Sequence, residues 1–452
     1  MKIESHENQT IERIAALVAE AGGRCFYVGG CVRDALRGES VKDLDVEVHG
    51  LKPAELEGIL DQVGERIAVG ESFGIYMLRG HDIDIAMPRR EKARGRGHRD
   101  FDVFVDPDLG LREAARRRDF TINAMMLDVL TGELQDPFGG EADLEAGVLR
   151  HVDERSFGED PLRVLRGAQF AARFRYEIAE ETRRLCAGMD LKTLPKERIL
   201  GEVEKALCRA EEPSIFFRQL RRMEQLDLWF PELAALIGVR QDPRFHQEGD
   251  VWNHTMMVLD QAARYREETE DPTGFMLAAL CHDMGKAICY QEEGDRIHSY
   301  GHETEGLPLV RAFLERITGE KARIRYVLNL VELHMKPNGM AHAHSSVKAT
   351  NRLFDRAVDP AALIYLAVAD SKGMCPPADD TALAFLLERL DLYREYMARP
   401  YVTGRDLEAA GVRPGPGMGA LLAYAHKLRL AGVPKEEALR QTLGMARSGK
   451  GI

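Results

Sequence analysis

The spacing of apolar residues changes about a third of the way along the chain. Between residues 24 and 87, short apolar or alternating runs such as RCFYV (24–28) and DLDVEV (43–48) lie between glycines, a pattern typical of strands. From about residue 151 the spacing is almost everywhere that of amphipathic helices. The sequence therefore predicts an α+β protein, with a small mixed-sheet domain followed by all-α domains.

The length and composition narrow the class of protein. A chain of 452 residues can bury two or three cores. Its seven cysteines are scattered without CxxC spacing, which favours reduced thiols over disulfides or a zinc site. The first residues lack the apolar core of a signal peptide, and no run approaches a membrane span. We therefore expect a cytoplasmic protein with no membrane partner.

Charge is distributed unevenly. The formal net charge of −12 argues against a protein that coats nucleic acid non-specifically. The segment RREKARGRGHR (89–99) is locally basic, and it fits either a phosphate-binding stretch or a solvated loop.

Two aspartates stand one residue apart in the second apolar run. Residues i and i+2 of a strand point to the same side, so Asp43 and Asp45 project together. Adjacent carboxylates repel unless a cation bridges them, which suits Mg²⁺, although the isolated pair also fits an exposed strand face. Gly29 and Gly30 permit a tight turn that can face a triphosphate, and Arg33 can hold a phosphate oxygen. Together these features favour metal-assisted chemistry on a nucleoside triphosphate.

Two later segments carry polar residues at helical spacing. In ARRRDFTINAM, apolar residues can anchor the segment while a polar set binds nucleotide: Arg117, Arg118, Asp119 and Asn123. In EDPLRVLRGAQFAARF, Asp160 and Arg163 are neighbours on one helix face. They fit either an ordinary salt bridge or a protein template that recognises a base. Such a template would match the donor–acceptor order of cytosine and adenine and reject uracil and guanine.

Six motifs in order resemble those of the bacterial class II tRNA nucleotidyltransferase family, which comprises CCA-adding enzymes, CC- and A-adding relatives and poly(A) polymerases. They are VGGCVRD, KDLDVEV, RRRDFTINAM, DPFGG, EDPLRVLRGAQFAARF and ERILGEVEKAL. The resemblance implies a nucleotidyltransferase head in which Asp43 and Asp45 are catalytic and hold Mg²⁺, followed by a helical neck. It implies nucleotide binding by Gly29, Gly30, Arg33, Arg117, Arg118, Asp119, Asn123, Asp160, Arg163 and Arg166.

One stretch departs from the family pattern. Where the family reads E-x-A-T-x-R-x-E-x-x-Y, this chain has DIDIAMPRREKARGRGHRDFDV (82–103), without the tyrosine and with extra basic residues. In the family this segment is a lever that governs the switch from C to A addition. The sequence therefore leaves open complete CCA addition, partial CC or A addition, and poly(A) addition.

Histidine and aspartate recur on the predicted helices between residues 246 and 375. An adjacent His282-Asp283 lies among apolar residues, and such nitrogen and oxygen donors suit Ni²⁺, Mn²⁺, Zn²⁺ or Fe. The order resembles the HD metal-dependent phosphohydrolase superfamily. By that resemblance the metal ligands are His254, His282, Asp283 and Asp370, with His302 and His334 near a second metal or a phosphate and Lys286 near a phosphate. The implied activity is hydrolysis of phosphoesters such as 2′,3′-cyclic phosphates, and the open alternative is a structural or vestigial metal site.

The sequence thus predicts a head (1–150), a neck for base reading and RNA binding (151–236), an HD domain (237–390) and a C-terminal helical tail (391–452). Residues 238–252 are interpreted as a linker. The expected partners are CTP, ATP and the acceptor end of tRNA. An alternative from another class is a metal phosphohydrolase whose head only binds nucleotide or RNA. No pattern indicates the oligomeric state or the role of the tail.

Overall fold

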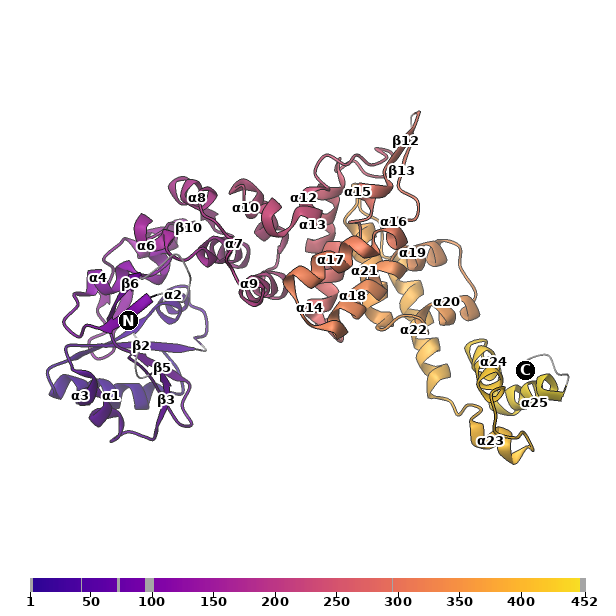
Figure 1. The fold of residues 1–452 in the computed structure, drawn as a ribbon, viewed down its shortest axis with the longest axis horizontal. Helices are drawn as coiled ribbons and strands as arrows, with labels where there is room; N and C mark the ends of the chain where they lie inside the picture. The colour runs from indigo at the N-terminus through magenta and orange to yellow at the C-terminus, as the bar shows by residue number, and fades with distance from the viewer. Residues whose placement is uncertain (1–2, 42, 71–73, 94–100, 295, 448–452) are drawn as a thin grey trace. The chain divides into compact units, whose positions relative to one another are not determined.

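The computed structural model describes residues 3–41, 43–70, 74–93, 101–294 and 296–447. The chain divides into two compact units (Figure 1). The first comprises Met1–Ala206 and Ile215–Leu228, and the second comprises Leu207–Ser214 and Trp229–Ile452. Among the described residues, no helix is long and apolar enough to cross a membrane. All seven cysteines are free thiols, as the sequence predicted.

A seven-stranded mixed sheet organises the first unit, in the order β3-β4-β5-β2-β1-β8-β9. Strands β2 and β5 pair in parallel and the other neighbours pair antiparallel, which confirms the predicted mixed sheet. These strands are β1 (Arg24–Val28), β2 (Leu44–His49), β3 (Arg66–Gly70), β4 (Ile75–Leu78), β5 (Ile83–Ala86), β8 (Met126–Asp128) and β9 (Leu134–Gln135). Strands β6 (Arg89–Ala93) and β7 (Phe101–Val105) form a separate antiparallel pair, and residues 94–100 of the basic stretch lie outside the described residues.

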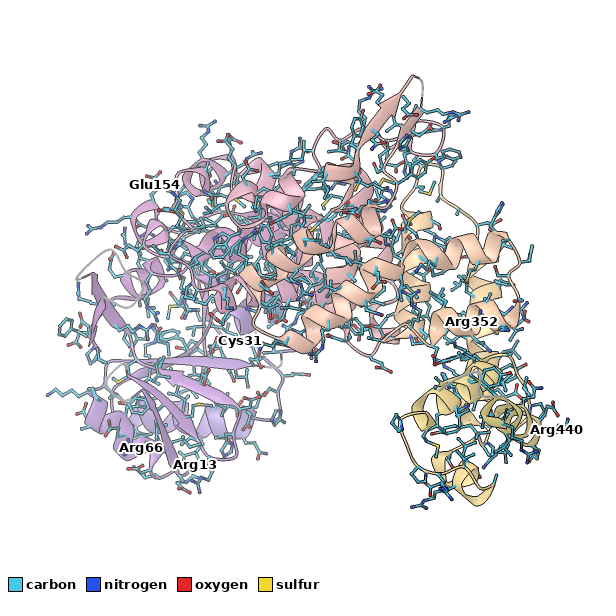
Figure 2. The ribbon with its side chains drawn as sticks, turned by 45° about the vertical axis from the view of Figure 1, so that its right-hand side comes forward. Arg13, Cys31, Arg66, Glu154, Arg352 and Arg440 are labelled. Carbon is cyan, nitrogen blue, oxygen red and sulfur yellow. The ribbon has the colours of Figure 1, made fainter. Side chains whose placement is uncertain are left out.

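The two faces of β2 differ in chemistry. Leu44, Val46 and Val48 are buried on one face. Asp45, which is partly buried, and Glu47, which is buried, project from the opposite face. Figure 1 shows α1 (Asn8–Glu20) and α3 (Pro53–Leu60) together on one side of the sheet. Arg13 on α1, which is labelled in Figure 2, joins the two helices by donating to the main-chain carbonyl of Gln62, just after α3. Helix α2 (Gly30–Leu36) begins at the glycine turn.

The segment that carries Arg117, Arg118 and Asp119 is not a continuous helix, contrary to the predicted spacing. Helix α4 (Leu111–Arg116) ends before it, and Phe120 is extended, with φ −119° and ψ 150°. The fully buried Phe120 ring packs edge-on against Phe157 and Phe170. Burial of this ring therefore overrides helical propensity, and a short 3₁₀ turn η2 (Thr121–Asn123) follows.

The DPFGG motif connects this segment to α5 (Gly140–Ala146). The carboxylate of Asp136 accepts hydrogen bonds from the main-chain amides of Gly140 and Glu141, which caps the helix. A Cβ atom at Gly140 would lie 2.2 Å from the carbonyl oxygen of Thr121. The glycine is thus required for close approach of α5 to η2.

Helices follow the sheet. They are α6 (Glu154–Gly158), α7 (Leu162–Phe174), α8 (Glu180–Ala187), α9 (Lys196–Arg209), α10 (Ser214–Arg222) and α11 (Leu226–Trp229). Asp160 was predicted on the helix face beside Arg163, but it lies just before α7, whose N-cap is Pro161. A short parallel pair, β10 (Val148–Leu149) and β11 (Glu177–Ile178), accompanies these helices.

In its described residues, the second unit is helical except for an unpredicted hairpin, β12 (Gln291–Glu293) with β13 (Arg296–His298). Its helical segments are α12 (Pro231–Ala234), α13 (Val251–Ala262), η3 (Arg266–Glu268), α14 (Pro272–Cys281), α15 (Lys286–Cys289), α16 (His302–Glu305), α17 (Leu307–Ile317), α18 (Lys321–Leu333), α19 (Met335–His342), α20 (Val347–Phe354), α21 (Pro360–Lys372) and α22 (Thr381–Ala398). The tail adds α23 (Gly404–Ala409), α24 (Met418–Leu430) and α25 (Lys435–Arg447), which share an apolar cluster around Leu407 and Leu421.

The interpretation of residues 238–252 as a linker is wrong. Arg240 and Asp250 form an isolated antiparallel bridge, and the Asp250 carboxylate accepts from the amide of Gly238. Gln241 and Asp242 are both buried. This segment is part of the folded second unit, and α13 begins at Val251.

We expect Gly140→Ala to destabilise the first unit by about 1–3 kcal/mol, because the added methyl group overlaps the Thr121 carbonyl. Gly201→Ala is the matched control. Gly201 lies inside α9 with open space around its Cβ position, so alanine there should stabilise by about 0.5–1 kcal/mol. Urea denaturation followed by circular dichroism measures both changes. Equal midpoints for the two variants would refute the close-approach argument.

Candidate functional site

The polar face of β2 carries the two predicted aspartates. Asp43 stands immediately before the strand and is exposed, and Asp45 lies on the strand and is partly buried. Burial raises the pKa of Asp45, the charge of Arg118 opposes that shift, and the charges of Asp84 and Asp43 add to it. A carboxylate with a raised pKa among other acids is a favourable position for a cation.

Asp84 is a third carboxylate at this site that the sequence reasoning did not identify. Its Cα atom is the direct partner of Asp45 in the parallel pairing of β2 with β5, so both side chains share one face. The alternation in DIDIAM resembles that in DLDVEV, and it could have suggested a second acidic strand. The pairing of these two strands could not be read from either run alone.

The glycine turn lies directly beside these acids. Gly29 has a φ of +74°, which favours glycine, and a Cβ atom there would lie 2.7 Å from Nη1 of Arg118 and 3.7 Å from Oδ2 of Asp45. The main chain at the turn can therefore approach both the acid and the guanidinium. Gly30 begins α2.

Glu47 organises two of the predicted arginines and is a second residue that sequence reasoning missed. Its side chain is 1% exposed and accepts from Nη2 of Arg117 at 2.9 Å, with Arg118 3.9 Å away. His49 contacts its other oxygen at 3.0 Å. Although burial opposes ionisation, the hydrogen bond with His49 and the charges of both arginines lower the pKa of Glu47 to about 2. The two guanidinium groups are thus held at the edge of the acidic face.

A second chain of polar contacts links the other nucleotide-binding candidates. Asp119 accepts from Nε of Arg166 at 2.7 Å and from Asn123 at 2.9 Å. Asn123 in turn accepts from Arg33 at 2.6 Å, and Arg33 also donates to Asp34. Burial opposes ionisation of Asp119, but the Arg166 charge and the Asn123 hydrogen bond lower its pKa to about 2. Arg33 is buried, so its guanidinium braces Asn123.

The predicted base-reading pair is held by the main chain. One oxygen of Asp160 accepts from the amide of Leu162 at 3.0 Å, and the other lies 3.5 Å from Arg198. Arg163 donates to the carbonyl oxygens of Ser156 and Arg117. The Arg163 guanidinium is therefore fixed in place, directly beside the segment that carries Arg117 and Arg118.

The second unit brings all the predicted histidine and aspartate ligands together. Among the described residues, three groups have ligand atoms within 4.8 Å of one another, and all lie in this unit. The carboxylates Asp43, Asp45 and Asp84 do not form such a group. The three groups are His254 with His282 and Asp370, Asp283 with His302 and His334, and His246 with Glu248 and His254.

Main-chain carbonyls orient three of the imidazoles. Nδ1 of His282, His302 and His334 lies 2.7–2.8 Å from the carbonyl oxygen three residues earlier in each case. A carbonyl only accepts, so each Nδ1 donates to it and each Nε2 is turned toward the centre of the cluster. Nε2 of His282 is buried with no hydrogen-bond partner among the described residues. Oδ2 of Asp283 lies 3.2 Å from this nitrogen, and an oriented imidazole nitrogen beside a carboxylate fits a metal ion.

Electrostatics in the cluster also suit a cation. Burial lowers the pKa of His334 to about 4, so this imidazole is neutral. Against the effect of burial, the charges of His282 and Lys286 hold the pKa of Asp283 well below its usual range. Nζ of Lys286 lies 2.7 Å from Asp283. Against the effect of burial, hydrogen bonds with Asp370 and Glu248 raise the pKa of His254 to about 9, so this imidazole must lose a proton when it binds a transition metal.

Glu248, from the segment interpreted as a linker, supports the cluster. One of its oxygens contacts Nδ1 of His246 at 2.7 Å and Nδ1 of His254 at 3.0 Å. The other accepts from the amide of Cys375, just after α21. Nε2 of His254 then faces Asp370 at 3.0 Å. A carboxylate behind a ligating histidine is the usual orienting partner in metal sites.

Comparison with known families matches both sites. Residues 25–150 match the poly A polymerase head domain, and residues 251–373 match the HD domain. A multifunctional CCA protein from Nitrosococcus oceani is 36% identical over 403 residues, covering 86% of this chain and 93% of the relative. The multifunctional CCA protein of Xanthomonas campestris is 35% identical over 431 residues, covering 92% of this chain and 100% of the relative.

Solved structures have a similar fold. A Thermotoga maritima CCA-adding enzyme complexed with tRNA aligns with a TM-score of 0.66 at 21% identity, over 99% of this chain and 100% of that one. A Bacillus stearothermophilus CCA-adding enzyme in complex with CTP aligns with a TM-score of 0.67 at 19% identity, over 99% of each chain. At these identities the likeness establishes the fold.

We expect Glu248→Gln to weaken binding of Ni²⁺ or Mn²⁺ at the histidine cluster by about 10- to 100-fold, because His254 loses its orienting carboxylate. Calorimetric titration of each ion into metal-free protein measures the change. The control is Glu315→Gln, an exposed residue of α17 that pairs with Arg311. Unchanged affinity in the Glu248 variant would show that this carboxylate does not support the metal site.

Proposed function

The chain belongs to the family of the multifunctional CCA proteins, and we propose that its head adds C, C and A to the 3′ end of tRNA from CTP and ATP. In the same proposal its HD domain hydrolyses phosphoesters at RNA ends, such as 2′,3′-cyclic phosphates. The observation that carries the first part is the acidic face of β2, where Asp45 lies beside both the glycine turn and Arg118. Groups for a metal and for a triphosphate therefore meet at the central strand of the sheet.

The head is suited to nucleotidyl transfer by an in-line displacement. The 3′-oxygen of the RNA bonds to the α-phosphorus, the bond to the β-phosphate oxygen breaks, and pyrophosphate leaves. Mg²⁺ held by Asp43 and Asp45, and by Asp84 beside them, would lower the pKa of the attacking hydroxyl and neutralise phosphate charge. Arg117 and Arg118, fixed by Glu47, bind the phosphates. Asn123 and Asp119 orient the sugar end of the nucleotide. Arg33 supports them by donating to Asn123, and Gly30 supports them at the start of α2.

Base choice in this proposal belongs to Asp160 and Arg163. Contacts with the amide of Leu162 and with the carbonyls of Ser156 and Arg117 hold the two side chains in place. A fixed acceptor beside a fixed donor matches cytosine and adenine and leaves buried groups unpaired with uracil or guanine. Arg166, paired with Asp119, connects base reading to the sugar and phosphate contacts.

The HD domain is suited to metal-assisted hydrolysis. We assign one metal to His254, His282, Asp283 and Asp370, and a second metal or the phosphate to His302 and His334. Nickel, manganese, zinc or iron fits this mixed nitrogen and oxygen set. A bound ion would supply a hydroxide nucleophile at neutral pH. Lys286, beside Asp283, binds a phosphate oxygen, and ring opening of a cyclic phosphate yields a phosphomonoester.

The remaining assignments follow from this activity. We propose a head of residues 1–150, a neck of residues 151–236 that contacts the acceptor stem, an HD domain of residues 237–390 and a helical tail of residues 391–452. The acceptor stem would be recognised by its shape and phosphates. Because tRNA maturation draws on nucleoside triphosphates, we place the protein in the cytoplasm, in keeping with its free thiols.

We expect the wild-type protein, given CTP, ATP and a tRNA that lacks CCA, to make 3′ ends that stop after one CCA. Asp45→Asn should reduce incorporation about a thousandfold, and Asp84→Asn about tenfold or more, because metal ligands are lost. Sequencing of the 3′ ends with timed sampling measures product and rate. Asp61→Asn, an exposed residue at the end of α3, is the control.

The products distinguish the alternatives. Ends with A alone or CC alone would identify a partial activity, and tails longer than one CCA would identify poly(A) addition. Unaltered incorporation by Asp45→Asn would favour a metal phosphohydrolase whose head only binds nucleotide or RNA.

We expect His282→Ala to abolish hydrolysis of adenosine 2′,3′-cyclic phosphate while leaving CCA addition intact, because the two activities use different metal sites. Chelation should remove hydrolysis, and Ni²⁺ or Mn²⁺ should restore it. Chromatographic separation of nucleotide products measures this activity. Hydrolysis that persists in His282→Ala would contradict the assignment of the cluster.

A further inference from the structure

A cavity of about 660 Å³ adjoins the HD cluster and has no role in the functions proposed above. The segment before α13 and the first turn of that helix line it, with polar side chains from Arg240, Gln241, His246 and Asn253. Its volume is far larger than one phosphate needs and is typical of sites for small organic ligands.

Two contacts connect this cavity to the metal ligands. The ring of His246 packs edge-on against that of His254, with centroids 5.0 Å apart. Nζ of Lys286 donates to Oε1 of Gln241 at 2.8 Å and lies 2.7 Å from Asp283. One ammonium group therefore separates the Gln241 amide from a metal ligand. A phosphate at the cluster would meet Lys286 first, and the group attached to that phosphate would extend toward Gln241.

Gln241 itself indicates a ligand. Its side chain is only 7% exposed, and its Oε1 is occupied by Lys286. Its Nε2 is buried without a hydrogen-bond partner in the part of the chain that the structure describes. A buried amide donor left unpaired is costly and rare in native proteins. An acceptor atom from a ligand in the cavity would satisfy it.

The charged groups in and beside the cavity lining already have protein partners, which leaves the Gln241 amide as the unpaired donor among the described residues there. Asp250 is the acid in the lining, and both of its oxygens already accept main-chain amides, from Asn253 and Gly238. Arg240 in the lining is paired with Glu292 at 3.2 Å, and Lys286, outside the lining, is paired with Asp283.

We propose that this cavity binds the nucleoside next to the scissile phosphate at an RNA 3′ end, with the Gln241 amide donating to an acceptor of that nucleoside. The proposal rests on the phosphohydrolase function of the HD domain proposed above. Gln241 thereby selects nucleotides over other phosphoesters, while Lys286 and the metal ligands act on the phosphate itself.

The test compares two five-membered cyclic phosphodiesters, adenosine 2′,3′-cyclic phosphate and glycerol 1,2-cyclic phosphate, with Mn²⁺-loaded full-length protein. Gln241→Glu keeps an oxygen for Lys286 and removes the donor, and Gln241→Ala removes both. We expect Gln241→Glu to raise KM for the adenosine substrate about tenfold or more. The new carboxylate also pairs with Lys286, so KM for the glycerol substrate should rise as well, but clearly less than KM for the adenosine substrate. Gln291→Ala, an exposed residue of β12 outside the cavity lining, is the control.

A binding measurement separates this inference from the function on which it rests. Adenosine 2′-monophosphate is titrated calorimetrically into metal-free wild type, the two Gln241 variants and the control. We expect weaker binding in both Gln241 variants and unchanged binding in the control. If wild type hydrolyses neither substrate, the proposed phosphohydrolase function is wrong. The titration still shows whether the cavity binds the nucleoside.

Two results would overturn the inference. Equal losses on the adenosine and glycerol substrates would show that Gln241 acts only through Lys286. Unchanged affinity for adenosine 2′-monophosphate in both Gln241 variants would show that the cavity does not bind the nucleoside.

Discussion

A carboxylate removed from water must meet a cation or several hydrogen-bond donors, and both sites of this protein are organised by that requirement. Glu47 is 1% exposed and is held by Arg117, Arg118 and His49. Asp283 is equally buried and lies among Lys286 and imidazole nitrogens. Losing one partner of such a group costs about 3–5 kcal/mol. The compensated acids therefore fix the positions of the groups around them.

The contrast between neighbouring acids defines the head. Glu47 and Asp45 lie two residues apart on one face of β2, yet the pKa of Glu47 is lowered to about 2 whereas that of Asp45 is raised. Arginines satisfy the first carboxylate, which serves to hold them. The second has Asp84 and Asp43 as neighbours, so it gains most from a divalent cation. Different surroundings thus give two similar side chains separate roles.

In the second unit, the segment before α13 connects the metal cluster to the space beside it. Glu248 from this segment orients His254 and also accepts from the amide of Cys375 after α21. Gln241 from the same segment contacts Lys286 and lines the adjoining cavity. A single stretch of irregular chain therefore supports the metal ligands and borders the proposed nucleoside site.

The sequence by itself determined the mixed-sheet head, the helical remainder, the shared direction of Asp43 and Asp45, and the histidines and aspartates of the second cluster. The first three follow from local spacing, because the period of a strand or helix sets where each side chain points, whereas the ligand set of the second cluster followed from the resemblance to the HD superfamily. Only the tertiary structure placed Asp84 beside Asp45, ended α4 before Arg117, and folded residues 238–250 against the cluster. Strand pairing, burial of the Phe120 ring and loop packing depend on contacts between residues distant in the chain, and no local pattern encodes those contacts.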